Sequence, residues 1–212
     1  MEVEYDEDGS YKIKMILVGE SGVGKTNLIN IMRDKDFDSD KESTTHCSFF
    51  NTKLNIDNVD INLYLWDTIG QEKLRAQTTI FFKNSKIVVL VYDITNKASF
   101  EKLEGWHELV KENLGENIVL GVLGNKKDLF LSEEVKEEEA EEYAKSIGAK
   151  WSLSSAKTER IKFVNYVNEL IQIYIKKANI KSDNNKKEVI VQNQNIKLTE
   201  KKQEKTKKKC CK

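Results

Sequence analysis

The chain has no proline, only three cysteines and no long apolar run, and the last two shortages narrow the class of protein. No stretch approaches the ~18 apolar residues of a membrane span. The N-terminus also lacks the cationic start and apolar segment of a signal peptide, so we expect a cytosolic chain. Residue 2 is Glu2 and not glycine, which excludes N-myristoylation. The lack of proline carries no information about function.

Net charge is also absent, because Lys+Arg and Asp+Glu both number 35. The overall charge therefore favours no nucleic-acid partner. The charges are nevertheless polarised: acidic residues gather in 1–9 and 133–142, whereas the last twelve residues hold seven lysines and one glutamate. Cys47 lies far along the chain from the adjoining Cys210 and Cys211. There is thus no disulfide framework, which agrees with a reducing compartment.

Hydrophobic patterning over the 212 residues predicts one compact domain and a tail. Apolar runs rich in β-branched residues predict buried strands at Tyr11 to Val18, Ile61 to Trp66, Ile87 to Tyr92, Ile118 to Leu123 and Lys150 to Leu153. Helical periodicity alternates with them at Thr26 to Met32, Phe100 to Val110, Val135 to Ile147 and Ile161 to Ile175. A short Asp57-Asn58 turn predicts an antiparallel hairpin of Ser48 to Ile56 with Val59 to Trp66.

This alternation predicts an α/β fold: a mostly parallel sheet with helices on both faces and one antiparallel edge strand. We divide the chain into an acidic extension (1–9), a domain (10–178) and a flexible basic tail (179–212), because the last segment is rich in Lys, Asn and Gln. In open α/β sheets, ligands bind outside the carboxyl ends of the strands. Four polar motifs each follow a predicted strand, so we expect them to converge.

The first motif, Gly19-Glu20-Ser21-Gly22-Val23-Gly24-Lys25-Thr26, is a complete phosphate-binding loop between a strand and a helix. Its glycines let backbone N–H groups turn toward phosphates, and the helix N-terminus adds partial positive charge. Lys25 is expected to neutralise the β and γ phosphates, and the Thr26 hydroxyl to bind Mg²⁺. The alternative, a glycine-rich turn without ligand, is disfavoured by the complete spacing. The predicted nucleotide contacts here are Ser21, Gly22, Val23, Gly24, Lys25, Thr26 and Asn27.

The second motif, Trp66-Asp67-Thr68-Ile69-Gly70-Gln71-Glu72, ends an apolar strand. The Asp67 carboxylate is well placed to hold the metal through water, and the Gly70 N–H to contact a γ-phosphate. Gln71 then sits where it can orient an attacking water. An aspartate at a strand end is often only a cap, but its distance of about forty residues from a phosphate loop favours the metal role.

The third and fourth motifs are Asn125-Lys126-Lys127-Asp128 and Ser154-Ser155-Ala156-Lys157. The Asp128 carboxylate can accept two hydrogen bonds from guanine, and adenine lacks both donors, so this residue selects GTP over ATP. Asn125 would brace the loop and the Lys126 stem would cover one base face. The Ala156 N–H would meet the guanine carbonyl, with Ser155 and Lys157 in the same predicted set. Each tetrapeptide alone is more often a polar turn; their order after the phosphate loop argues for the base site.

Together these residues resemble the Ras superfamily of small GTPases over 10–178, and the Rab branch most closely. The resemblance implies a P-loop G domain with a six-stranded sheet and five helices, which binds GTP or GDP with Mg²⁺ and hydrolyses GTP slowly. By position, Thr44 is the switch threonine that completes the metal shell, and Phe37 packs across the guanine. The resemblance also implies that Gln71 is the catalytic glutamine and acts with Lys25 and Thr44. The implied role is a monomeric switch in vesicle-mediated membrane traffic.

The C-terminus resembles the Rab double-cysteine pattern, since Cys210 and Cys211 are followed by one lysine and no CaaX box exists. This implies prenylation of both thiols and anchoring to the cytosolic face of an intracellular membrane, with a chaperone-bound cytosolic pool. The implied partners are an exchange factor, an activating protein, a GDP dissociation inhibitor, a Rab escort protein and switch-region effectors. The alternative is a disordered basic tail with incidental cysteines.

The chain departs from its family in the switches, with Ile69 for the usual alanine, His46 for the usual glycine, and a segment from Phe81 to Asn84 for two tyrosines followed by Arg-Gly. Two alternatives therefore stay open: a GTP-binding scaffold with little hydrolysis, or another branch of the superfamily. A P-loop ATPase or kinase would share only the phosphate loop. None of the three arginines sits where the family uses an arginine finger, so fast turnover needs an activating protein.

Overall fold

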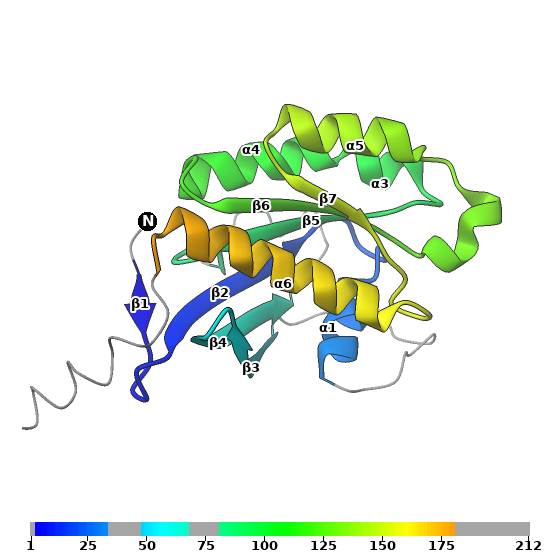
Figure 1. Ribbon diagram of the computed structural model, residues 1–212. Helices are drawn as coiled ribbons and strands as arrows, with labels where there is room; N and C mark the ends of the chain where they lie inside the picture. The colour runs from blue at the N-terminus through cyan, green and yellow to red at the C-terminus, as the bar shows by residue number, and fades with distance from the viewer. Residues whose placement is uncertain (1–2, 34–47, 68–80, 181–212) are drawn as a thin grey trace, which may run out of the picture.

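The computed structural model describes residues 3–33, 48–67 and 81–180, and shows a mixed α/β domain (Figure 1). Its strands are β1 (Glu4–Tyr5), β2 (Tyr11–Val18), β3 (Ser48–Ile56), β4 (Val59–Asp67), β5 (Ile87–Asp93), β6 (Val119–Asn125) and β7 (Lys150–Leu153). The helices are α1 (Lys25–Met32), α3 (Lys97–Glu101), α4 (Leu103–Leu114), the 3₁₀ helix η2 (Lys127–Ser132), α5 (Glu137–Ser146) and α6 (Arg160–Lys177).

The strands form one sheet in the order β3-β4-β2-β5-β6-β7. Strands β4, β2, β5, β6 and β7 run parallel, and β3 pairs antiparallel with β4 at the edge. The turn between β3 and β4 places Asp57 and Asn58 at φ 53° and 60°, as a two-residue hairpin of the I′ type requires. The predicted fold class is therefore confirmed, including the antiparallel edge and the α/β alternation.

Helices cover both faces of the sheet because its central strands are apolar on both sides. On β2, Ile13, Met15 and Leu17 face one core, which α1 and α6 close with Leu28, Phe163 and Leu170. Ile16 and Val18 face the other core, closed by α3, α4 and α5 through residues such as Trp106 and Ala144. Figure 1 shows the two helical layers on opposite sides of the strands.

The sheet has seven strands, one more than the predicted six, because the N-terminal segment adds β1. Strand β1 pairs antiparallel with the start of β2, in register Glu4 with Lys12. Val3 packs against the core, Tyr5 lies 4.9 Å from Tyr11 between ring centroids, and Lys86 Nζ lies 3.2 Å from Glu4 Oε1. Part of the predicted extension 1–9 is thus attached to the sheet.

The predicted helix from Phe100 to Val110 is two helices in the structure. Helix α3 is capped by Asn96, whose side chain accepts from the Ser99 N–H, and it ends at Glu101. Helix α4 restarts one residue later, after Lys102. Within the described residues, no helix is both long and apolar enough to cross a bilayer.

Candidate nucleotide-binding site

The parallel strands end at one edge of the sheet, and the predicted motifs meet there. Gly19 follows β2, Asp67 ends β4, Asn125 ends β6 and Ser154 follows β7. Because these strands run in the same direction, the motifs share the edge where open α/β sheets bind ligands.

The phosphate loop adopts a conformation that needs glycine at two positions. Gly24 has φ 95° and caps α1, and a Cβ there would lie 2.3 Å from Asn125 Nδ2. A Cβ on Gly19, at φ 145°, would lie 2.1 Å from the Val91 carbonyl oxygen. Ser21 and Gly22 lie exposed at the rim of the loop. The loop therefore brings the N-terminus of α1 to the strand edge, a geometry suited to anions.

Lys25 is buried beneath this loop, with 5% of its surface exposed. Its Nζ donates to the carbonyl oxygens of Gly19 and Glu20, both at 2.8 Å. Burial lowers the pKa of Lys25 to about 8, although the negative charges of Asp67 and Glu20 oppose the shift. The site thus holds an ammonium group in a desolvated position, where its attraction for an anion is strong.

Asp67 and Thr26 are the predicted metal ligands that the structure describes. Asp67 is 3% exposed and close enough to Lys25 to influence its pKa. Thr26 follows Lys25 in the first turn of α1 and is half-buried. Carboxylate and hydroxyl oxygens are hard ligands of the type that Mg²⁺ prefers. Among the described residues no group of three or more His, Cys, Asp or Glu forms a metal cluster, so an ion here would need further oxygens.

Asn125 joins the phosphate half of the site to the base half. Its side chain is 2% exposed; Nδ2 donates to the Val23 carbonyl at 2.8 Å, and Oδ1 accepts from the Ala156 N–H at 3.1 Å. One buried amide therefore fixes two loops that lie far apart in the sequence.

Asp128 is held by Ser155, a residue of the Ser154-Ser155-Ala156-Lys157 motif. Ser155 Oγ donates to Asp128 Oδ1 at 2.6 Å and accepts from the backbone N–H groups of Lys157 and Thr158, each at 3.1 Å. The Asp128 carboxylate is half-buried. Ser155 therefore restricts the orientation of this carboxylate.

Two residues of the site were missed by the sequence analysis. Asp93 ends β5, and its Oδ2 lies 2.6 Å from Lys126 Nζ, while its Oδ1 accepts from Thr95. Glu20, inside the phosphate loop, contacts α4. Asp93 had a signal, since it is a polar residue ending an apolar strand, as Asp67 and Asn125 are. The signal for Glu20 was its charge, because an acidic side chain is unexpected within a loop that should bind anions.

Among the described members of the predicted site, hydrogen bonds and close packing bring together Val23, Gly24, Lys25, Asn125, Asp128, Ser155, Ala156 and Lys157. Asn27 lies further along α1. The predicted Phe37, Thr44, Gly70 and Gln71 lie outside the described residues, as do Cys210 and Cys211.

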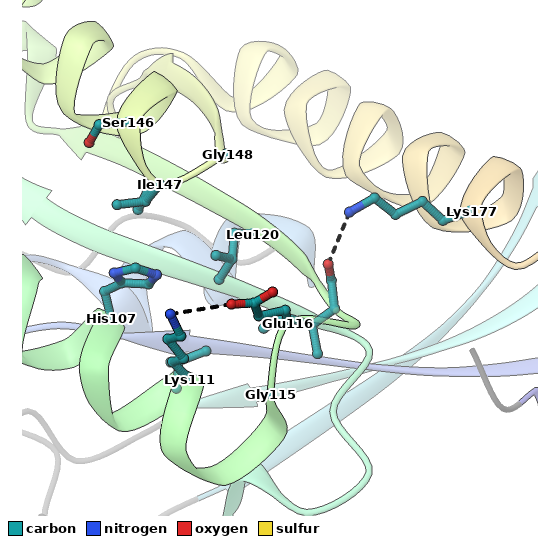
Figure 2. A pocket seen from close by; sticks show the side chains of 11 residues that line it. His107, Lys111, Gly115, Glu116, Leu120, Ser146, Ile147, Gly148 and Lys177 are labelled. Carbon is teal, nitrogen blue, oxygen red and sulfur yellow. Dashed lines mark hydrogen bonds and ion pairs between the residues drawn. The ribbon is translucent and has the colours of Figure 1, made fainter.

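A separate pocket of about 360 Å³ lies between the ends of α4, α5 and α6 (Figure 2). It is at the end of the domain where β6 begins, opposite the strand edge that carries the motifs. Its lysines have partners there: Lys111 Nζ lies 3.2 Å from Glu116 Oε1, and Lys177 Nζ donates to the Ile118 carbonyl at 3.2 Å. This pocket has none of the phosphate-loop geometry.

Fold and site together define a P-loop domain whose base loops suit guanine, and comparisons place it in a family. The Ras family model matches residues 14–179. The Ras-related protein Rab-21 of Homo sapiens is 40% identical over 151 residues, covering 71% of this chain and 67% of the relative. The Ras-related protein YPTC6 of Chlamydomonas reinhardtii is 33% identical over 186 residues, or 86% of each chain. Bovine Rab-26 is 39% identical over 146 residues, or 68% and 57%.

The chain belongs to the Ras family and is a Rab-type small GTPase. It binds guanine nucleotide, hydrolyses GTP, and has the role in membrane traffic that follows from membership of the Rab family. Regulators, effectors and association with intracellular membranes belong to that role in general terms.

Proposed function

We propose that the chain is a Mg²⁺-dependent GTP/GDP switch in which Lys25 binds the phosphates and Asp128 binds the guanine. The observation that supports this most directly is the buried Asn125, which ties the loop around Lys25 to the loop that orients Asp128. The fold then fixes the distance between the Lys25 loop, which would bind the phosphates, and the Asp128 loop, which would bind the guanine. A nucleotide is the ligand class with matching groups at both ends.

At the phosphate end, Lys25 and the loop N–H groups would compensate the charge of the β and γ phosphates. The Thr26 hydroxyl, the Asp67 carboxylate and Thr44 would hold Mg²⁺, and the ion would supply charge stabilisation for phosphoryl transfer. Gly70 would contribute an N–H to the γ-phosphate. Thr44 and Gly70 stay sequence-based assignments.

At the base end, the Asp128 carboxylate would accept from guanine, with the Ala156 N–H donating to the guanine carbonyl. Ser155 and Lys157 shape this loop through the hydrogen bonds of Ser155 Oγ. The Lys126 stem would cover one face of the base, since Asp93 holds its ammonium group. Phe37 would pack across the guanine from switch I.

Hydrolysis requires little covalent chemistry from the protein, so positioning dominates. Gln71 would orient the attacking water, with Lys25 and Thr44 placing the γ-phosphate. In the absence of an arginine at a finger position, we expect slow turnover of the purified protein, accelerated by an activating protein.

Single-turnover hydrolysis of GTP by the full-length protein tests this assignment. We expect a rate far below about 1 per second for the protein alone. With an activating protein present, we expect the Gln71→Leu variant to hydrolyse GTP much more slowly than the unaltered protein does under the same stimulation. A rate near 1 per second without any activator would contradict the need for one. Tight GTP binding with no hydrolysis under any condition would instead support a GTP-binding scaffold.

Effector recruitment is proposed at an aromatic surface beside the switches. Phe49 and Trp66 stack with ring centroids 5.4 Å apart, and Trp66 lies 6.2 Å from Phe81. Phe49 is 54% exposed and Lys14 Nζ lies 4.2 Å from the Trp66 ring centroid. Aromatic side chains are enriched at protein interfaces. Phe49 belongs to β3 and Trp66 to β4, and in the sequence these strands adjoin the predicted switches.

Membrane anchoring is proposed through prenyl groups on Cys210 and Cys211. Two chains anchor stably where one binds reversibly, so a GDP dissociation inhibitor and a Rab escort protein would be needed to keep a cytosolic pool. The terminal lysines would add attraction to an anionic cytosolic leaflet. An exchange factor and an activating protein would set the nucleotide state at that membrane.

We expect an N-terminally tagged full-length protein to mark a discrete organelle, and the Cys210→Ser/Cys211→Ser variant to be diffuse, because the variant keeps the G domain but loses both lipid attachment points. Imaging of both in the same cell type provides the comparison. A single Cys47→Ser variant is the matched control and should localise as the unaltered protein does. Identical patterns for the unaltered protein and the double variant would rule out the tail as the anchor.

A further inference from the structure

Glu20 is an acidic side chain within the phosphate loop. A carboxylate beside a polyphosphate is repulsive, and the repulsion grows where water is excluded. Such a residue is compatible with phosphate binding only if its charge is turned aside and compensated. The structure shows how this is done.

The Glu20 side chain is directed to helix α4 and not into the loop. Its Oε2 lies 2.9 Å from Lys102 Nζ, and its Oε1 accepts from Trp106 Nε1 at 3.2 Å. The Glu20 side chain is 15% exposed and the Trp106 residue is fully buried. The carboxylate therefore receives one charged and one neutral donor in a partly desolvated position, where charge-assisted hydrogen bonds are strong.

The backbone of the same residue holds the phosphate-binding lysine. The Glu20 carbonyl oxygen accepts from Lys25 Nζ at 2.8 Å, and the Glu20 charge counteracts the burial that lowers the Lys25 pKa. Glu20 thus connects Lys25, at the centre of the site, to a helix more than eighty residues further along the chain.

The α3–α4 segment also braces the base half of the site. Ser99 Oγ accepts from the Asp93 N–H at 3.0 Å, and Asp93 Oδ2 lies 2.6 Å from Lys126 Nζ. Lys102 stands directly between α3 and α4. One helical segment therefore contacts residues that hold both ends of the nucleotide site.

We propose that Lys102 and Trp106 form with Glu20 a charge-compensated clamp, and that compensation of the Glu20 charge keeps nucleotide release slow. Lys102 cancels a negative charge that would otherwise repel the phosphates, and the Trp106 N–H helps to hold the carboxylate on the α4 side. The proposal rests on the proposed function of Lys25 in phosphate binding.

The test is the dissociation rate of fluorescently labelled GDP from the full-length protein at fixed Mg²⁺. Lys102→Ala leaves the Glu20 charge uncompensated, so we expect release about threefold to tenfold faster. Glu20→Gln keeps an acceptor for Trp106 and removes the charge, so its release should stay within about twofold of the unaltered protein. In the Glu20→Gln/Lys102→Ala double variant the release rate should also be within about twofold of that of the unaltered protein, because no charge is left to compensate.

Such a rescue is the distinguishing readout, because simple loss of a structural contact would not be repaired by a second substitution. Trp106→Phe keeps the aromatic packing and removes the N–H donor, so release should again be faster. The matched control is Glu116→Ala, which breaks the exposed Lys111–Glu116 pair in the separate pocket and should leave the rate unchanged.

If Lys102→Ala releases GDP at the unaltered rate, the clamp is wrong. The clamp is also wrong if the Glu20→Gln/Lys102→Ala double variant releases GDP as fast as Lys102→Ala. Lys25→Ala separates the clamp from the proposed function. If Lys25→Ala binds GDP as tightly as the unaltered protein, the phosphate role of Lys25 is wrong. If Lys25→Ala loses binding while the Lys102 variants are unchanged, only the clamp is wrong.

Discussion

Replacing Lys25 with alanine is expected to weaken GDP and GTP binding by at least about a hundredfold, because it removes the one buried cation beneath the phosphate loop that the described residues place there. Its Nζ is held by two carbonyl oxygens at 2.8 Å, so no neighbouring lysine can take over the position without rebuilding the loop. Equilibrium titration with labelled GDP measures the loss. Lys111→Ala, in the separate pocket, is the matched lysine control and should bind normally.

The same side chain gives nucleotide binding a defined pH dependence. Burial lowers the Lys25 pKa to about 8 before nucleotide binds, and phosphate oxygens favour its ammonium form, so binding takes up a proton. Affinity should therefore be highest below pH 8 and fall as pH rises through about 8, by at most about tenfold per unit. Lys25→Ala should lack this slope.

Stability of the nucleotide-free protein should respond in the opposite sense. The Lys25 pKa is about 8 in the folded protein and 10.5 for an ordinary lysine, so between these pH values the unfolded chain binds more protons at this residue. The contribution of Lys25 to the free energy of unfolding therefore rises with pH across that window. Affinity and stability that both fall above pH 8, with the same dependence in Lys25→Ala, would contradict this assignment.

Replacing Asp128 with alanine is expected to remove guanine selectivity. GTP affinity should fall by about three orders of magnitude, because guanine donors would be left facing an apolar methyl group, whereas the weak ATP affinity should change little. The hydrogen bond of Ser155 to Asp128 at 2.6 Å shows that the carboxylate is fixed in advance, so its loss is not offset by a mobile neighbour. Competition of GTP and ATP against labelled GDP measures both affinities.

Glu138→Ala is the matched control for Asp128, since it removes one carboxylate from the exposed face of α5. It should leave both affinities unchanged. An equal loss of GTP and ATP binding in Asp128→Ala would mean that the substitution disturbs the loop as a whole. Unchanged GTP binding would remove Asp128 from the base site.

The sheet was predictable because its central strands are buried on both faces. Two-sided burial forces continuous apolar runs, as in β5 (Ile87–Asp93), which is buried at every residue and contains the predicted strand Ile87 to Tyr92. The runs from Tyr11 to Val18 and from Lys150 to Leu153 coincide with β2 and with the edge strand β7. The Asp57-Asn58 turn was predictable because only a few residues adopt positive φ readily. The positions of these elements can therefore be predicted from the apolar runs and turn residues of the sequence itself.

Strand β1 and the break at Lys102 were not predictable from such patterns. Two residues are too short to show a period of two, and Glu4 is stabilised by Lys86, which lies eighty-two residues away. The break between α3 and α4 leaves the helical spacing of apolar residues almost unchanged, so periodicity cannot detect it. Both features depend on tertiary contacts.

In the candidate site, too, some residues could be predicted from the sequence and others depend on tertiary contacts. The motifs name Lys25, Asn125 and Asp128 because phosphate and guanine recognition require particular side chains at fixed spacing. They do not name the groups that hold those side chains: Glu20 occupies a variable position of the loop pattern, and its partners Lys102 and Trp106 lie on a distant helix. Supporting contacts of this kind follow from the fold and not from the motif.

The guanine site is tested most directly by displacement of labelled GDP from the purified full-length protein by unlabelled GTP and by ATP. We predict displacement by GTP at concentrations close to that of the labelled GDP, and none by ATP at about a thousandfold excess. Displacement by ATP at concentrations comparable to GTP would contradict a site in which Asp128 reads guanine.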